Sequence, residues 1–234
     1  MKPKPLPNPG EDPFVGGSEM ARRMRALDWS TTSLGDVSTW PQSLRSALGI
    51  CVESRFPIAL YWGADLTLLY NDAWSPIAGA KHPWALGRPA IDVWPEIWGD
   101  IGPLFEQVFS TGDATYLEDA LLLMRRHGYT EECYFNYTFT PIRGEQGTVE
   151  GVFNAVIETT FRVIAERRTA LLREVGERLA GLKGIDDVCT TAATLIARDG
   201  LDATFCIVYL IDEKSRSARR AAVAGIPEDR KSVV

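Results

Sequence analysis

Histidine is scarce in this sequence, which holds two among 234 residues, His82 and His127. Both fall in segments predicted to be loops or turns, and neither has the helical setting with an acidic neighbour that a phosphoacceptor histidine usually occupies. The sequence also lacks a Gly-x-x-x-x-Gly-Lys-Ser/Thr phosphate loop, a Gly-x-Ser-x-Gly nucleophile elbow and the nucleotide-binding signatures of kinases. We therefore expect no catalytic machinery in the chain itself.

Cysteine is also sparse, and the four cysteines are scattered along the chain without a Cys-x-x-Cys pair or a nearby histidine. They are Cys51, Cys133, Cys189 and Cys206. This spacing argues against a structural zinc site, and the apolar surroundings of the four residues favour reduced thiols in a core. We expect no metal site.

Long hydrophobic runs and an excess of positive charge are absent too. No stretch approaches the roughly 18 consecutive apolar residues of a membrane-spanning helix. The formal net charge of −6 gives no overall attraction to nucleic acid or anionic lipid. With 45% apolar and 24% charged residues, the composition is that of a soluble globular protein. We expect a cytoplasmic protein that binds no nucleic acid and has no membrane span in this chain.

The first 55 residues divide into a tail and a helical lead-in. Residues 1–15 are rich in proline and contain no apolar run, which predicts a disordered tail and not a signal peptide. In the lead-in, residues 16–55, Ser18 is placed to cap a first helix. A second helix is expected after Trp40, because four apolar residues there recur at helical spacing. They are Leu44, Leu48, Cys51 and Val52.

Residues 56–160 read as strands around a block of short helices. Two apolar runs, 58–62 and 66–70, flank a three-residue loop and predict a hairpin. Three further strands are expected between residues 114 and 157, the clearest over 133–140, where apolar and polar residues alternate. This order predicts an α+β domain with a five-stranded antiparallel sheet and helices on one face.

A helical period returns from residue 161. Apolar residues recur there at alternating spacings of four and three, as in the seam of a coiled coil; they are Phe161, Ala165, Leu172, Val175, Leu179 and Leu182. Arg168 interrupts this seam, and a single amphipathic helix packed on its own domain remains the alternative. We expect residues 161–183 to form a coiled-coil-like linker helix that makes the chain a homodimer.

Residues 184–234 contain one predicted helix and two predicted strands, over 203–211 and 221–224. So few elements cannot close a core by themselves. We therefore expect the start of a truncated second, α/β domain, whose remainder lies beyond this sequence.

Several short motifs lie between Asp28 and Arg168. Asn71-Asp72-Ala73 ends the second predicted strand, and Leu86-Gly87-Arg88-Pro89 precedes the main helix. Thr140-Pro141-Ile142-Arg143 precedes a glycine-containing turn, and Glu158-Thr159-Thr160 ends the last predicted strand of the sheet. As a set, these motifs resemble the PAS domain family, many members of which end in Asp-Ile-Thr where this sequence has Glu in place of Asp.

Two flanking segments extend the resemblance. The segment from Asp28-Trp29-Ser30 to Arg45 resembles a lead-in found before one PAS subgroup in bacterial multi-sensor histidine kinases. Val223-Ala224-Gly225-Ile226, after two predicted strands, is similar to the start of a GAF domain.

The resemblance implies a sensory input and dimerisation module of a two-component sensor histidine kinase, acting in a phosphorelay. A small ligand or a partner would bind between sheet and helices, and the signal would leave through the linker helix, a bistable element in a dimer. Glu158, Thr159 and Thr160 are the expected relay, since either threonine is placed to cap that helix. The alternative is a stand-alone small-molecule or haem-binding PAS protein without kinase output.

The prediction of a ligand pocket is based on the aromatic residues. Five of the seven tryptophans fall in the predicted sensor: Trp62, Trp74, Trp84, Trp94 and Trp98. Such residues either line a pocket for a small apolar ligand or fill the core of a small sheet domain. The candidate pocket residues are Asn71, Trp74, Tyr134 and Asn136.

No cofactor is identified by the sequence. If the domain bound haem, His82 would be the axial ligand. A photoactive flavin domain of this family carries a Gly-Arg-Asn-Cys type motif, whereas here Gly87-Arg88 is followed by Pro89-Ala90, so flavin photochemistry is not expected. Arg125, Arg126 and Arg143 stand beside predicted turns, where basic side chains are usually solvated.

Overall fold

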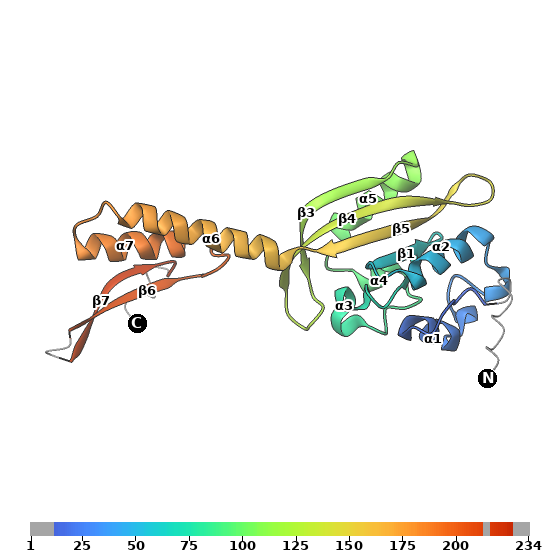
Figure 1. Ribbon diagram of the computed structural model, residues 1–234, viewed down its shortest axis with the longest axis horizontal. Coiled ribbons are helices and arrows are strands. Elements are labelled where there is room, and N and C mark those ends of the chain that lie inside the picture. Colours follow the sequence, from blue (N-terminus) through green and yellow to red (C-terminus); the bar gives the residue numbers. More distant parts are fainter. Residues whose placement is uncertain (1–11, 213–215, 227–234) are drawn as a thin grey trace, which may run out of the picture. The chain divides into compact units, whose positions relative to one another are not determined.

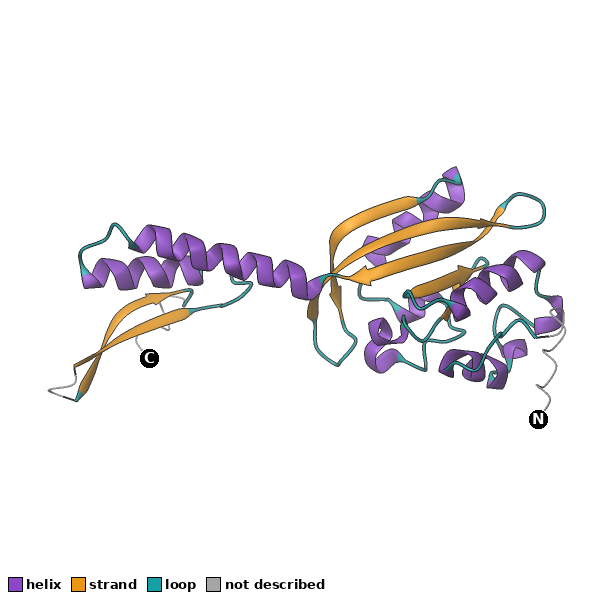
Figure 2. Ribbon diagram, in the orientation of Figure 1, coloured by secondary structure: helices purple, strands orange, loops and turns teal. Residues whose placement is uncertain are grey.

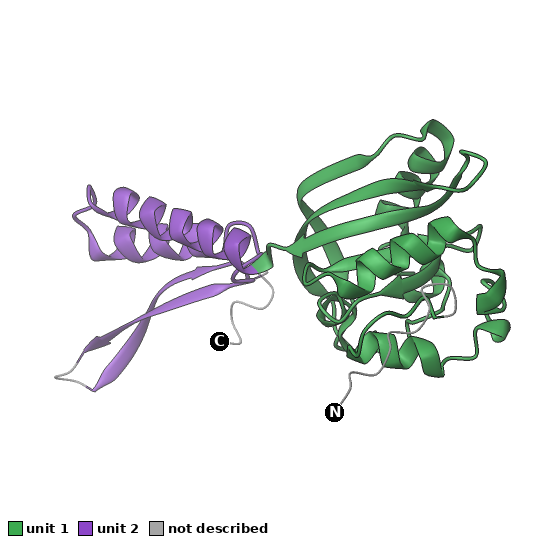
Figure 3. Ribbon diagram, turned by 45° about the vertical axis from the view of Figure 1, so that its right-hand side comes forward, with its two compact units in different colours: residues 1–160 green, residues 161–234 purple. Residues whose placement is uncertain are grey.

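The computed structural model describes residues 12–212 and 216–226 and divides the chain into two compact units, residues 1–160 and residues 161–234 (Figure 3). Residues 1–11 of the predicted tail and residues 227–234 of the predicted second domain lie outside the described residues. The first unit holds the predicted lead-in and sensor, and the second begins with the predicted linker helix.

A five-stranded antiparallel sheet forms the centre of the first unit (Figure 2). Its strands are β1 (Ile58–Trp62), β2 (Thr67–Tyr70), β3 (Thr115–Met124), β4 (Glu131–Arg143) and β5 (Val149–Glu158). They lie in the order β2-β1-β5-β4-β3, with every neighbouring pair antiparallel. The predicted α+β fold class, with its hairpin followed by three strands, is confirmed.

One face of this sheet is covered by α3 (Ser75–Ala78), η3 (Gly79–Lys81), α4 (Ala90–Val93) and α5 (Trp98–Thr111). Side chains alternate between the two faces along β4, and every second residue points toward these helices. Phe135, Tyr137 and Phe139 are the side chains on that face, and all three are buried. The ring of Phe105 from α5 stacks on Phe139 with centroids 4.3 Å apart and meets Tyr61 of β1 at 4.8 Å. Aromatic rings from α5, β1 and β4 thus pack against one another between helices and sheet.

The lead-in adds a second helical layer, which the prediction of helices on one face did not place. It comprises α1 (Glu19–Ala26), η1 (Trp29–Thr31), η2 (Val37–Thr39) and α2 (Gln42–Glu53). Helix α2 packs on β1 (Figure 1), and its Leu44 lines a hollow with Trp62. Since Trp62 alternates with Tyr61 along β1, α2 covers the face opposite to α5. All five residues of β1 are therefore buried.

The predicted start of α1 is confirmed in detail, because Ser18 Oγ accepts a hydrogen bond of 3.1 Å from the backbone N–H of Ala21. The N-terminus of α1 also contacts Asp72, which follows β2 in the chain. The two carboxylate oxygens of Asp72 accept hydrogen bonds from the backbone N–H groups of Glu19 and Met20 at 2.9 and 2.8 Å. A residue of the PAS-like Asn-Asp-Ala motif thus ties the lead-in to the sheet.

The second unit contains α6 (Thr160–Leu179), α7 (Ile185–Ile196) and an antiparallel pair of strands, β6 (Cys206–Asp212) and β7 (Ser217–Ala224). Among the described residues of this unit, the buried core is small and consists of Cys189, Ala193 and Ala222. No described helix of either unit is long and apolar enough to cross a membrane.

Arg168, which interrupts the predicted seam of α6, is used within this second unit. It lies 2.8 Å from the carboxylate of Asp202, and Arg167 contacts the same carboxylate at 2.9 Å. The hydrogen bonds from the two guanidinium groups lower the pKa of Asp202 to about 2. The position of Arg168 is therefore explained by an ion pair and not by the seam.

Candidate functional site

A cavity of about 50 Å³ lies between the sheet and its covering helices in the first unit. Trp74, Ile77 and Trp94 contribute to its wall from the helical side. The sheet contributes residues of β3, β4 and β5, among them Met124, Tyr137 and Val156. Its place between helices and sheet is the one that the PAS resemblance implies for a ligand.

The described residues that line this cavity include no charged side chain. Burial raises the pKa of Tyr61 and raises that of Tyr137 to about 12, so both phenols stay neutral at physiological pH. Asn154 supplies an amide, but that amide donates to the backbone oxygen of Thr138 at 3.1 Å. Because an unpaired charge in such a site would be strongly disfavoured, the cavity suits a neutral occupant.

Of the four predicted pocket residues, Trp74 lines the cavity. Asn71 is fully buried, but its amide Nδ2 donates to the backbone oxygens of Cys51, Ser54 and Phe56 at 2.7–3.1 Å. Its Oδ1 accepts from the N–H groups of Ile58 and Trp74. Asn71 therefore connects the lead-in, β1 and the segment that carries Trp74 through hydrogen bonds.

Tyr134 and Asn136 lie on the opposite face of β4 from the cavity, because side chains alternate along a strand and the cavity is lined by Phe135 and Tyr137. The phenol of Tyr134 donates to Glu132, and the Oδ1 of Asn136 accepts from the N–H of Asp119 at 2.7 Å. Both predicted pocket residues thus belong to the outer sheet surface.

His82 does not line the cavity either, and both of its ring nitrogens contact protein groups. Nδ1 lies 2.9 Å from the hydroxyl of Tyr70, and Nε2 lies 3.4 Å from the carboxylate of Glu19 on α1. The histidine bridges the lead-in and the buried end of β2. A cavity of about 50 Å³ also leaves no room for a haem, for which His82 was the candidate axial ligand.

Four of the five tryptophans of the predicted sensor divide between the two roles that the sequence left open. Trp74 and Trp94 line the cavity, with ring centroids 5.9 Å apart. Trp98 stacks on Phe105, and Trp62 packs on the opposite face of the sheet. Trp84 is 48% exposed and lies under the guanidinium of Arg88.

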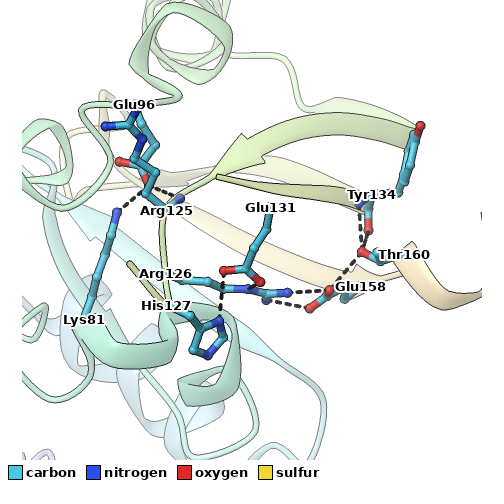
Figure 4. A network of polar contacts seen from close by, with 9 residues as sticks. All are labelled: Lys81, Glu96, Arg125, Arg126, His127, Glu131, Tyr134, Glu158 and Thr160. Carbon is cyan, nitrogen blue, oxygen red and sulfur yellow. Dashed lines mark hydrogen bonds and ion pairs between the residues drawn. The ribbon is translucent and has the colours of Figure 1, made fainter. Parts of the chain in front are cut away.

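A polar cluster of Arg126, Glu131, Glu158 and Thr160, here called the junction cluster, joins the β3–β4 turn to the start of α6 (Figure 4). Arg126 is 8% exposed, and its two terminal nitrogens each lie 2.7 Å from an oxygen of Glu158. Its Nε donates to Glu131 at 3.1 Å. Thr160 donates to Glu158 and accepts from the N–H of Tyr134, both at 2.9 Å.

The hydrogen bonds of the junction cluster stabilise the charged forms of Arg126, Glu158 and Glu131. The hydrogen bonds that Arg126 donates to the carboxylate of Glu158 raise the pKa of Arg126. Burial acts to raise the pKa of Glu158 and of Glu131, but hydrogen bonds from Arg126, Thr160 and His127 outweigh it and leave both values lowered. The cluster is therefore a buried cation held between two carboxylates, a geometry in which guanidinium is specific.

The junction cluster is attached to the segment that forms the helical wall of the cavity. The backbone oxygen of Arg126 accepts from the N–H of Ala80 at 2.8 Å, three residues beyond Ile77. Gly79, with φ of +54°, permits this approach, because a Cβ there would come within 2.8 Å of the same oxygen. Arg126 and Glu158 each follow a cavity-lining residue, Met124 and Val156, by two positions.

The three predicted relay residues thus lie where β5 meets α6. The side chains of the two threonines, however, make other contacts than the predicted helix cap. Thr159 Oγ1 donates to the carboxylate of Asp119 at 2.8 Å, and Thr160 Oγ1 bonds to Glu158 and β4. Arg126 was missed, because its expected place was in solvent. No local pattern marks it, since the β4–β5 pairing is what brings Glu158 within reach.

No family model matches the chain. Among solved structures it resembles the sensory box sensor histidine kinase from Vibrio cholerae, with 15% identity and a TM-score of 0.34 over 44% of this chain and 77% of that one. It also resembles the PAS domain of a protein from Colwellia psychrerythraea, with 14% identity and a TM-score of 0.39 over 50% of this chain and 97% of that one. For the PAS domain of Bordetella pertussis BvgS, the identity is 19% and the TM-score 0.34, over 53% of this chain and 92% of that one. At these values the likeness concerns the fold alone.

Proposed function

We propose that this chain is the sensory input and dimerisation module of a bacterial two-component sensor histidine kinase. Residues 56–160 act as the PAS sensor, residues 161–183 as the linker helix, and residues 184–234 as the start of a GAF-like domain. A ligand or partner bound at the sensor changes the linker, and the linker acts on a downstream output domain.

The observation that carries this proposal is the physical connection between cavity and linker. Trp74 and Ile77 in the cavity wall continue into Gly79 and Ala80, which rest on the backbone of Arg126. Arg126 in turn holds Glu158, the last residue of β5, two positions before the first residue of α6. An occupant that moved the helical wall would alter the position of Arg126 and hence the first turn of the linker helix.

This relay can be tested by filling the cavity and observing the junction. Xenon enters small, dry, apolar cavities, so pressurising the ¹⁵N-labelled chain with xenon should shift amide resonances of residues 158–164 as well as those of the cavity wall. In Glu158→Gln the cavity response should remain, while the response of residues 160–164 should disappear.

Glu118→Gln is the matched control for the relay, because Glu118 is exposed on β3 and outside the junction cluster. It should behave as the unaltered chain. A chain whose cavity amides respond to xenon while residues 158–164 do not would contradict the proposed relay.

Dimerisation through α6 is supported by the exposure of its apolar residues. Phe161 is 88% and Leu172 is 73% exposed, and no described side chain of α6 is buried within the chain. A second copy packed along the seam would remove these side chains from water, at about 25 cal/mol per Å² of apolar surface.

Replacing Leu172 and Leu179 together by glutamine, which preserves helix propensity, is expected to weaken the dimer by at least about tenfold. Sedimentation equilibrium measures the change. The matched control is Arg173→Gln with Glu177→Gln, on exposed positions of the same helix that lie off the seam. If the double leucine variant sediments as the unaltered chain does, α6 is not the dimer contact.

A further inference from the structure

The indole N–H of Trp74 is buried without an acceptor. Trp74 is 2% exposed, and its Nε1 has no hydrogen-bond partner among the described residues. The other indoles need not behave in this way: Nε1 of Trp29 donates to Met24 O at 2.7 Å, and that of Trp40 donates to Gly35 O at 3.2 Å. Since buried indole N–H groups usually find a partner, the group at Trp74 requires an explanation.

The location of Trp74 supplies one, because its side chain forms part of the cavity wall. The ring is held from two sides, by Tyr70 at 4.7 Å and by Trp94 at 5.9 Å between centroids. Its backbone N–H is fixed by Asn71 Oδ1 at 3.0 Å. A donor held so firmly is preorganised for an acceptor that the chain itself does not provide.

The size and polarity of the cavity limit what that acceptor belongs to. One water needs roughly 10–15 Å³ and a cavity of about 150 Å³ accommodates benzene, so about 50 Å³ accommodates two or three heavy atoms. None of the described residues that line the wall is charged, so an ion is strongly disfavoured there.

We propose that the cavity binds a neutral molecule of two or three heavy atoms whose hydrogen-bond acceptor is held by the indole N–H of Trp74. The proposal rests on the sensory function proposed above, in which this molecule is the sensed ligand. It assigns Trp74 as the residue that selects an acceptor-bearing ligand over an apolar one of equal size.

The test uses two linear probes of three heavy atoms, acetonitrile with a nitrogen acceptor and propyne without one, added to the ¹⁵N-labelled full chain. The Trp74 indole resonance, assigned by its absence in Trp74→Phe, should move downfield with saturation on addition of acetonitrile. In Trp74→Phe the affinity for acetonitrile should fall about threefold to tenfold, and that for propyne by less than about twofold.

Trp84→Phe is the matched control, since Trp84 is half exposed and outside the cavity, and it should bind both probes as the unaltered chain does. Equal losses for the two probes in Trp74→Phe would overturn the proposal, and so would a water that persists at the Trp74 indole when acetonitrile is saturating. Discrimination by Trp74 with an unresponsive junction would instead contradict the relay alone.

Discussion

Replacing Arg126 with glutamine is expected to lower the free energy of unfolding of the first unit by about 2–4 kcal/mol. Removing one partner of a buried ion pair costs about 3–5 kcal/mol. The lower range applies here because the side chain of Glu158 is 31% exposed and water screens part of its charge. Urea denaturation followed by tryptophan fluorescence measures the loss.

The adjacent arginine is the matched control for this substitution. Arg125 has an exposed side chain whose Nε lies 3.3 Å from Thr130, so Arg125→Gln should change stability by less than about 0.5 kcal/mol. The stability loss of Arg126→Lys should lie between those of Arg125→Gln and Arg126→Gln, because an ammonium group retains the charge but not the bidentate geometry. Equal effects of Arg125→Gln and Arg126→Gln would show that the junction cluster does not stabilise the fold.

At acid pH, the difference in the free energy of unfolding between Arg126→Gln and the unaltered chain should become smaller. The folded-state pKa values of Glu158 and Glu131 lie below the ordinary 4.5. Their contribution to stability is therefore fully present above about pH 4.5 and is lost as pH falls through the lowered values. Since the variant has lost Arg126, which helps to lower both pKa values beside Thr160 and His127, its stability should depend less on pH in the acid range.

The sequence predicted the strands well because their signals are local. Alternation over residues 133–140 and the hairpin at 58–70 both depend on side-chain period and turn residues, which the chain carries within a few positions. The burial of Leu44, Leu48 and Cys51 followed in the same way from helical spacing.

The candidate site was harder to predict because it depends on the choice of face and on pairing at long range. Tyr134 and Tyr137 are both aromatic, and alternation separates them onto two faces without saying which face meets the helices. The burial of Arg126 requires Glu158, which arrives through the pairing of Phe135 with Glu158 across β4 and β5. The amphipathic stripe of α2 likewise does not specify a side of the sheet.

Asn71→Asp is expected to destabilise the first unit by about 3–5 kcal/mol, although the two side chains have nearly the same shape. The amide donates to three backbone oxygens, that of the buried Cys51 and those of Ser54 and Phe56. A carboxylate has no N–H, so these oxygens lose their donor and meet a negative charge, each lost contact costing about 1–3 kcal/mol. Hydrogen exchange should show lost protection at the C-terminal turn of α2 and at β1.

Asn136→Asp gives the matched comparison, since Asn136 acts as an acceptor for the N–H of Asp119 on the outer face and a carboxylate accepts equally well. It should cost less than about 1 kcal/mol. Burial raises the pKa of a carboxyl group at position 71 in the folded state, so the deficit of Asn71→Asp is full above that pKa and shrinks as pH falls toward the ordinary value of about 3.9. A constant deficit across this range, or equal costs for the two variants, would show that Asn71 does not hold the lead-in to the sheet by donating hydrogen bonds.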